Sequence, residues 1–131
     1  MNTVAITGRI TSDLRTVYMK HGSYLQFDVG VPRDYTSSEK ARDETDFIHC
    51  RAFYHTADFI ASHFGKGQPI GLTGHWQTKT RIDENGNYVT DNYLLISNVS
   101  FFGTKAENER YMAAMSAEEK AIEEYNESAN Y

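Results

Sequence analysis

The stretch with the most informative side chains lies near the middle of the chain, between residues 47 and 53. Every second residue there is small and apolar: Ile48, Cys50 and Ala52. The alternate positions hold two rings and two basic or basic-capable groups: Phe47, His49, Arg51 and Phe53. Because side chains of a β-strand alternate between its two faces, the pattern predicts a strand with one buried face and one aromatic, basic face.

An aromatic, basic face has the chemistry that single-stranded nucleic acid requires. Bases stack on flat rings, with about 1–3 kcal/mol per stacked base, and cations follow the phosphates. The competing interpretation is that Phe47 and Phe53 pack beneath a loop, a helix or a second subunit, because exposed sheet faces are often covered. The sequence of this strand alone leaves both interpretations open.

A second basic face, further along the chain, favours the binding of nucleic acid. In residues 69–82, one face of the predicted strand carries His75, Gln77, Lys79 and Arg81. The alternative is a solvated edge strand whose charges prevent aggregation. More cations and a ring flank the second predicted strand: Lys20, Arg33, Tyr35, Lys40 and Arg42. Rings and cations spread over several elements indicate an extended surface rather than a pocket.

The elements that must position these side chains form an all-β domain over residues 1–103. Alternating hydrophobicity predicts five strands, at residues 2–10, 24–31, 45–54, 69–82 and 88–102. A short helix is expected at residues 56–64, and Asn85-Gly86 marks a hairpin turn before the last strand. Five strands with one short helix between strands 3 and 4 is the order of the OB fold, a small Greek-key barrel.

The acidic charge of the chain is concentrated in its C-terminal tail, residues 104–131. The net charge is −5, of which −4 comes from Lys105 onward. The remainder is nearly neutral, and such a domain still binds a polyanion if its basic residues share one face. Residues 106–125 lack a strong apolar stripe. We therefore expect a tail that is mobile, or helical only against a partner.

Enzymatic alternatives find little support in the sequence. Cys50 would need a base such as His49 or His55, but it faces the apolar side of its strand, as a buried structural thiol does. A cluster of acidic residues lies in a polar, solvent-facing loop: Asp43, Glu44 and Asp46. The five histidines lack zinc-ligand spacing, and no phosphate-binding glycine loop is present. We expect no catalysis, no metal and no cofactor.

The sequence also carries expectations about location. No apolar run approaches 18 residues, which predicts no membrane span. The N-terminus lacks the layout of a signal peptide, and the single cysteine excludes an internal disulfide. We expect a cytoplasmic protein.

Several segments, in this order and spacing, resemble the bacterial single-stranded DNA-binding protein family over about residues 1–102. They are NTVAITGRIT at 2–11, DLR at 13–15, FDVGVPR at 27–33, TDFI at 45–48, KGQPIGLTG at 66–74 and QTK at 77–79. Four single positions add to the match: Gly22, Asp83, Gly86 and Tyr88. The resemblance implies an OB fold, a homotetramer, and DNA wrapped over stacking rings and cations.

The resemblance also implies roles for individual residues. Phe47 and Phe53 fall on stacking positions of the family, Tyr35 falls near a third, and Lys66 falls on a basic position. Arg81 stands where the family often has an aromatic residue. Trp76 replaces an aliphatic residue, so it is either a core or interface residue or a further stacking ring. The chain lacks the family's usual acidic, aromatic tip, and its brevity resembles phage-encoded members, which would place it in the host cytoplasm.

Taken together, we predict sequence-independent binding and protection of single-stranded DNA during replication, recombination and repair. The predicted stacking residues are Phe47, Phe53, Tyr35 and Trp76. The predicted phosphate contacts are Arg9, Lys20, Arg33, Arg51, Lys66, Lys79 and Arg81. A homo-oligomer is expected, with replication or recombination proteins as possible partners of the tail. The alternative is an OB module that binds RNA or serves replication restart or protein interaction.

Overall fold

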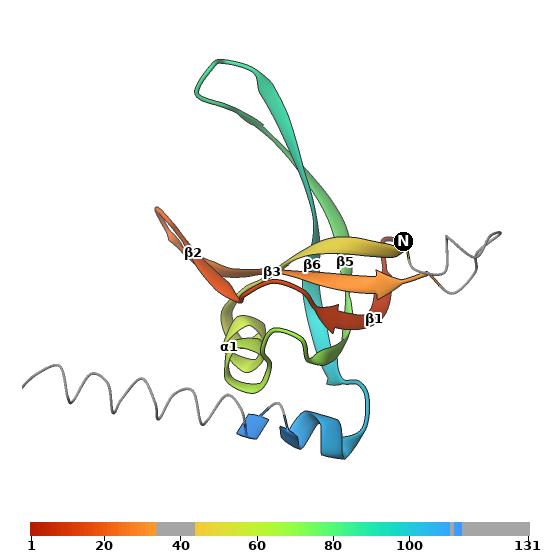
Figure 1. Cartoon of the computed structure of the whole chain (residues 1–131). Coiled ribbons are helices and arrows are strands. Elements are labelled where there is room, and N and C mark those ends of the chain that lie inside the picture. The colour runs from red at the N-terminus through yellow and green to blue at the C-terminus, as the bar shows by residue number, and fades with distance from the viewer. Residues whose placement is uncertain (34–43, 111, 114–131) are drawn as a thin grey trace, which may run out of the picture.

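The computed structural model describes residues 1–33, 44–110 and 112–113 of the chain (Figure 1). Its elements follow the predicted order, with one added strand segment. They are β1 (Val4–Ile10), β2 (Arg15–Met19), β3 (Gly22–Pro32), β4 (Thr45–Ala52), α1 (Tyr54–His63), β5 (Pro69–Ile82) and β6 (Tyr88–Phe101). A short helical segment follows at residues 105–110.

The added segment, β2, continues the first strand after a break at residues 11–14. Both β1 and β2 pair antiparallel with β3, so the two segments act as one bent strand. The sequence did not predict β2 as a strand. Four of its five residues are exposed, so it has no buried face to produce alternating hydrophobic and polar residues. The helix α1 begins at Tyr54, two residues before the predicted start, and its N-cap residue Phe53 makes no side-chain capping hydrogen bond.

The sheet closes into a barrel. Its strand order is β1-β5-β6-β4-β3-β2, and an additional pairing joins β1 to β3 through Arg9↔Gly30 and Ile10↔Val29. The contact between β4 and β6 is parallel and aligns Cys50 with Leu94. This Greek-key closure agrees with the predicted OB arrangement, including the helix between the strands at 45–52 and 69–82.

A close backbone approach at Gly8 makes the closure possible. A Cβ atom at Gly8 would lie 2.3 Å from the carbonyl oxygen of Gly30 across the closing strands. Position 8 of the first strand therefore requires glycine, the one residue without a side chain.

The barrel interior is filled by the inward faces of the strands and capped by α1. Ile60 of the helix and Phe64 just after it are fully buried. The other core residues come from the strands: Ile10, Leu25, Phe27, Val29, Cys50, Ala52, Ile70, Leu72, Leu94 and Ile96. The predicted inward face of residues 48–52 therefore supplies part of the core.

The chain after β6 returns to the barrel. Asn108 is 8% exposed and donates hydrogen bonds to the carbonyl oxygens of Phe102 (3.3 Å) and Thr104 (3.1 Å). The buried Gln68 side chain donates to Asn108 Oδ1 at 3.2 Å. The first helical turn after residue 104 is therefore packed on the domain.

We expect Gly8→Ala to destabilise the protein by at least about 2 kcal/mol, because the added methyl group meets backbone that must shift. Gly71→Ala is the matched control, since its Cβ would lie 2.7 Å from Ser100 Oγ, a side-chain atom that can rotate away. Chemical denaturation measures both free energies of unfolding. Equal losses of stability in the two variants would contradict the closure argument.

Candidate nucleic-acid interface

The two basic faces predicted from the sequence lie on one continuous face of the sheet. Residues paired directly across antiparallel strands point to the same side. On β3 and β4 the pairs are Gln26↔Arg51, Asp28↔His49 and Gly30↔Phe47. On β5 and β6 they are Gln77↔Tyr93, Lys79↔Asp91 and Arg81↔Val89. The Arg51 guanidinium lies 4.0 Å from the centre of the Tyr93 ring, which joins the two halves.

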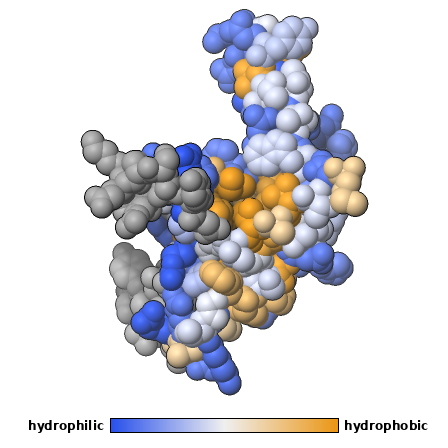
Figure 2. Space-filling model, turned by 90° about the vertical axis from the view of Figure 1, so that its right-hand side faces the viewer, coloured by the Kyte–Doolittle hydropathy of each residue, from blue (hydrophilic) through white to orange (hydrophobic). Residues whose placement is uncertain are grey.

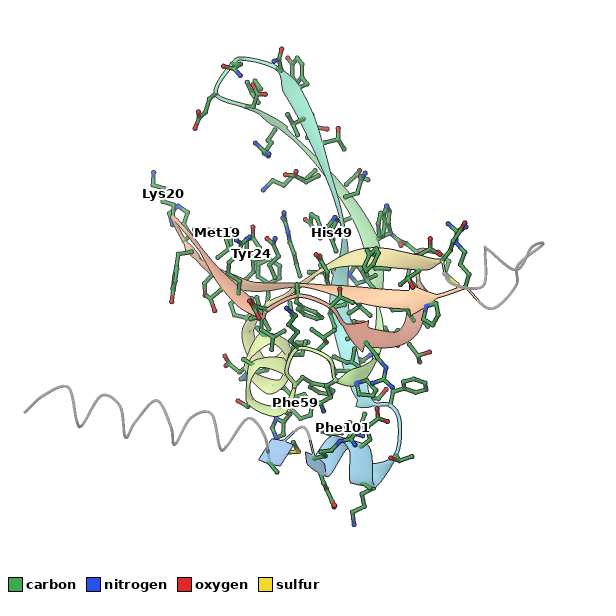
Figure 3. All side chains as sticks on the ribbon, in the orientation of Figure 1. Met19, Lys20, Tyr24, His49, Phe59 and Phe101 are labelled. Carbon is green, nitrogen blue, oxygen red and sulfur yellow. The ribbon has the colours of Figure 1, made fainter. Side chains whose placement is uncertain are left out.

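We call this surface the cleft face. It comprises Tyr24, Gln26, Asp28, Phe47, His49, Arg51, Phe53, Gln77, Lys79, Arg81, Asp91 and Tyr93. Two hairpin arms, β2–β3 and β5–β6, extend from the barrel and diverge on either side of it (Figure 1). Figure 3 shows Tyr24 and His49 between the arms, and Met19 and Lys20 toward the tip of the β2–β3 arm. Between them this face is hollowed into an open groove, where a hollow of about 380 Å³ is lined by Gln26, His49, Arg51, Asp91 and Tyr93, among others.

Aromatic and basic groups form a row across the floor of the groove. The Arg51 guanidinium lies 4.7 Å from the centre of the Tyr24 ring and 4.0 Å from that of Tyr93. The Tyr24 ring is 5.6 Å from the Phe53 ring, and the Tyr93 hydroxyl donates to Gln77 Oε1 at 3.0 Å. The row thus runs from the start of α1 across β3, β4 and β6 to β5.

Tyr24 and Tyr93 were not among the residues predicted from the sequence. Tyr24 stands at the start of the polar, outer face of the strand predicted at 24–31, two residues before Gln26. Its alternation with Gln26 and Asp28 was the available signal. Tyr93 had no comparable signal in the sequence. It lies next to Arg51 only because β4 and β6 pair in parallel, and these two strands are far apart in the sequence.

Carboxylates accompany several cations of the cleft face. His49 Nδ1 lies 2.6 Å from Asp28 Oδ1, and Arg81 Nε donates to Asp91 Oδ2 at 2.9 Å. Lys79 is exposed on the same arm as Arg81. A phosphate group that binds Arg81 must therefore compete with the Asp91 carboxylate.

Arg33 lies at the end of β3, beside the start of β4. It donates to both carboxylate oxygens of Asp46, with the shortest contact at 3.0 Å, and it is paired with Glu44. The hydrogen bond from Arg33 holds the pKa of Asp46 below its usual value. These two acidic residues are thus engaged with a cation, and no group suited to a metal ion occurs among the described residues.

The remaining predicted residues lie elsewhere. Arg9 is on β1 and is paired with Glu107 at 2.9 Å. Lys66 is exposed in the turn between α1 and β5, and Lys20 is exposed at the tip of the β2–β3 arm. Trp76 is 40% exposed and points to the side of β5 opposite Lys79, where it pairs with the buried Leu94. Tyr35 lies outside the described residues.

Cys50 is fully buried on the inner face of β4, as predicted for a structural thiol. Burial, with a smaller contribution from the Asp28 carboxylate, raises the pKa of Cys50 to about 12. The thiol therefore stays protonated near neutral pH.

The fold class is shown by solved structures that resemble the chain. A crystal structure of the mitochondrial single-stranded DNA-binding protein Rim1 from S. cerevisiae matches 78% of this chain and 95% of its own, with a TM-score of 0.60 and 16% identity. The Plasmodium falciparum SSB in complex with single-stranded DNA matches 79% and 96%, with a TM-score of 0.66 and 14% identity. The chain is thus an OB-fold barrel, as predicted.

The sequence defines the family within this class. The profile of the Single-strand binding protein family matches residues 1–102, and the chain belongs to this family. The single-stranded DNA-binding protein of Fusobacterium nucleatum is 35% identical over 77% of this chain and 66% of its own length. Single-stranded DNA-binding protein 2 of Listeria monocytogenes is 30% identical over 100% and 77%. The chain spans less than two thirds of the Fusobacterium protein.

In the part of the chain that the structure describes, no helix has the length and apolar character needed to cross a bilayer.

We expect Cys50 to react with iodoacetamide at least about tenfold more slowly in the folded protein than in denaturant at each pH between 7 and 10, because the buried thiol is reached only when the domain opens. An unhindered thiol titrates near pH 8.5, so the same reaction in denaturant should accelerate through that range. Mass spectrometry at timed intervals measures both rates. A native rate equal to the rate in denaturant would contradict the burial of the thiol.

Proposed function

We propose that the protein binds single-stranded DNA with little overall sequence preference and protects it during replication, recombination and repair. The cleft face supports this proposal most strongly, because it unites the exposed Phe47 ring, the partly buried Tyr24 and Phe53 rings and several cations along one groove. Stacking on rings tolerates any base, and an open groove admits a flexible strand more readily than a duplex. The proposed activity is binding without catalysis.

The proposed stacking residues frame the groove. Phe47 is 63% exposed at one end of β4, and Phe53 is half-buried just beyond the other end. Tyr35, which lies outside the described residues, and Trp76, which lies on the side of β5 opposite the cleft face, remain proposed stacking residues from the sequence. A DNA strand that runs along β4 would therefore meet Phe47 at one end of the groove floor and Phe53 at the other.

Four of the proposed phosphate contacts line this path, and the other three lie away from it. The cations along the path are Lys20 on one arm, Lys79 and Arg81 on the other, and Arg51 on the floor. The others are Lys66 beyond α1, Arg9 on β1 and Arg33 at the end of β3. Arg9, Arg33 and Arg81 each form an ion pair with a carboxylate in the structure. Neutralised phosphates release counterions, so affinity should fall as salt rises.

A homo-oligomer, with a tetramer as its expected form, is part of the proposal. Residues 4–8 of β1 pair with β5 on one edge only, among the described residues, and unpaired strand edges favour association. A hollow of about 780 Å³ beside this edge is lined by Ile6, Val31, Phe47 and Phe102, among others. Figure 2, which views the molecule from the β1 side, shows apolar side chains gathered there. We also propose a cytoplasmic location, in a host cell if the chain is phage-encoded, and replication or recombination proteins as partners of residues 104–131.

We expect Phe47→Ala and Phe53→Ala each to weaken binding to labelled oligo-dT by about 1–3 kcal/mol, because each removes a stacking ring. Fluorescence anisotropy at low and high salt measures the affinity. Phe59→Ala is the matched control: Phe59 is also an exposed ring, but it lies on α1, at the end of the barrel away from the arms (Figure 3). Affinities of the Phe47 and Phe53 variants equal to that of the control would contradict the stacking assignment.

The same titration separates the proposed function from its alternatives. We expect oligo-dT to bind more tightly than duplex DNA or oligo-U. Tighter binding of oligo-U would indicate an RNA-binding module. Absence of binding to all three would indicate that the cleft face serves protein interaction.

A further inference from the structure

Arg51 differs from the other arginines of the predicted binding surface in what surrounds it. Arg9, Arg33 and Arg81 each form an ion pair with a carboxylate. Within the described residues, neither a hydrogen bond nor an ion pair engages the Arg51 guanidinium, whose partners are the rings of Tyr24 and Tyr93. These rings come from β3 and β6, the strands on either side of β4.

This arrangement holds the guanidinium in place and leaves its hydrogen-bonding edge for a ligand. The N–H donors of arginine lie in the plane of the group, so rings that flank it leave those donors available. A side chain fixed before binding loses less conformational entropy when a ligand arrives. Arg51 is thus prepared for a group that offers two neighbouring acceptor atoms.

The position of Arg51 favours a base over a phosphate. It lies on the floor of the groove, next to Tyr24, whose ring is in turn 5.6 Å from Phe53, a proposed stacking ring. The cations placed for the phosphate backbone are on the arms, at Lys20, Lys79 and Arg81. A hollow of about 380 Å³ opens beside the guanidinium and is also lined by Gln26, His49, Asp91 and Asn92.

The groups around this hollow match guanine. Guanine presents the neighbouring acceptors N7 and O6, which fit the arginine fork, whereas adenine and thymine each offer one acceptor on that edge. In a single strand cytosine also presents two neighbouring acceptors, O2 and N3, but it lacks the two donors that guanine carries on its next edge. The next edge of guanine carries the N1–H and N2–H donors, which suit a carboxylate. Asp91 supplies a carboxylate to the same hollow, and its ion pair with Arg81 uses one oxygen, Oδ2.

We propose that Arg51, held between Tyr24 and Tyr93, forms a guanine-binding subsite in the floor of the groove, in place of the phosphate contact that the sequence predicts for it. This proposal rests on the proposed binding of single-stranded DNA and adds a preference for one base at one position. The other stacking positions tolerate any base, so the result is a preference for guanine-containing strands and not a recognition sequence.

The test compares two strands that differ in one atom of each guanine. One is a short, labelled strand of alternating thymine and guanine; in the other, 7-deazaguanine replaces guanine and a C–H group replaces the N7 acceptor. Lithium buffer prevents four-stranded guanine structures. We expect the wild-type protein to bind the guanine strand about tenfold more tightly, because the substitution removes one of two charge-assisted hydrogen bonds.

Three variants assign the preference to residues. Arg51→Lys keeps the charge and loses the fork, so its ratio of the two affinities should fall to about one. Tyr93→Leu removes one flanking ring and should lower the ratio as well. Arg15→Lys, the control at an exposed arginine of β2 that has no proposed DNA contact, should keep the wild-type ratio. Thermal melting establishes that each variant is folded.

The outcomes separate the subsite from the function on which it rests. Equal wild-type affinities for the two strands, or a preference that persists in Arg51→Lys, would overturn the guanine subsite. A wild-type ratio near one, with Arg51→Lys weaker on both strands alike, would make Arg51 a phosphate contact and likewise overturn it. Failure of the wild-type protein to bind any single strand would overturn the proposed function instead.

Discussion

The structure depends on the contact between two backbones at the point where the barrel closes. The carbonyl oxygen of Gly30 occupies the space that any side chain at position 8 would need. This approach lets β1 and β2 pair with β3 as one bent strand, first inside the barrel and then along the arm. Closure of the barrel thus encloses the hydrophobic core. It also directs the β2–β3 arm outward beside the groove.

A second constraint is the distribution of charge within the groove. A protein with a net negative charge binds a polyanion only if its cations are concentrated where the strand lies. On the cleft face, Asp28 and Asp91 hold His49 and Arg81 before any ligand arrives. Such pairs are exposed and therefore weak, so phosphates can replace the carboxylates at small cost. Apart from the histidine, the cleft face carries three cations, Arg51, Lys79 and Arg81, against these two carboxylates, so it is slightly positive in a chain of net negative charge.

Much of the fold was predictable because its signals are local. The alternation in residues 47–53 gave the inner and outer faces of β4, and the strand at residues 69–82 has the predicted bounds. The segment β2 lacked a signal because it lies on an arm with little to bury. The union of the two basic faces, and the role of Tyr93, depend on register between segments about 40 residues apart in sequence, which no local pattern encodes.

The segment that follows β6 leaves the barrel at the end opposite the arms, beside α1 (Figure 1). Gln68 and Asn108 attach its first turn to that end through a buried hydrogen bond. A protein that recognises this turn would therefore approach from below the barrel, while a nucleic-acid strand would enter from above. Glu107 in this turn is paired with Arg9, a proposed phosphate contact, so a nucleic-acid strand that reached Arg9 would compete with the turn, whereas a strand confined to the cleft face would leave the turn open to a partner.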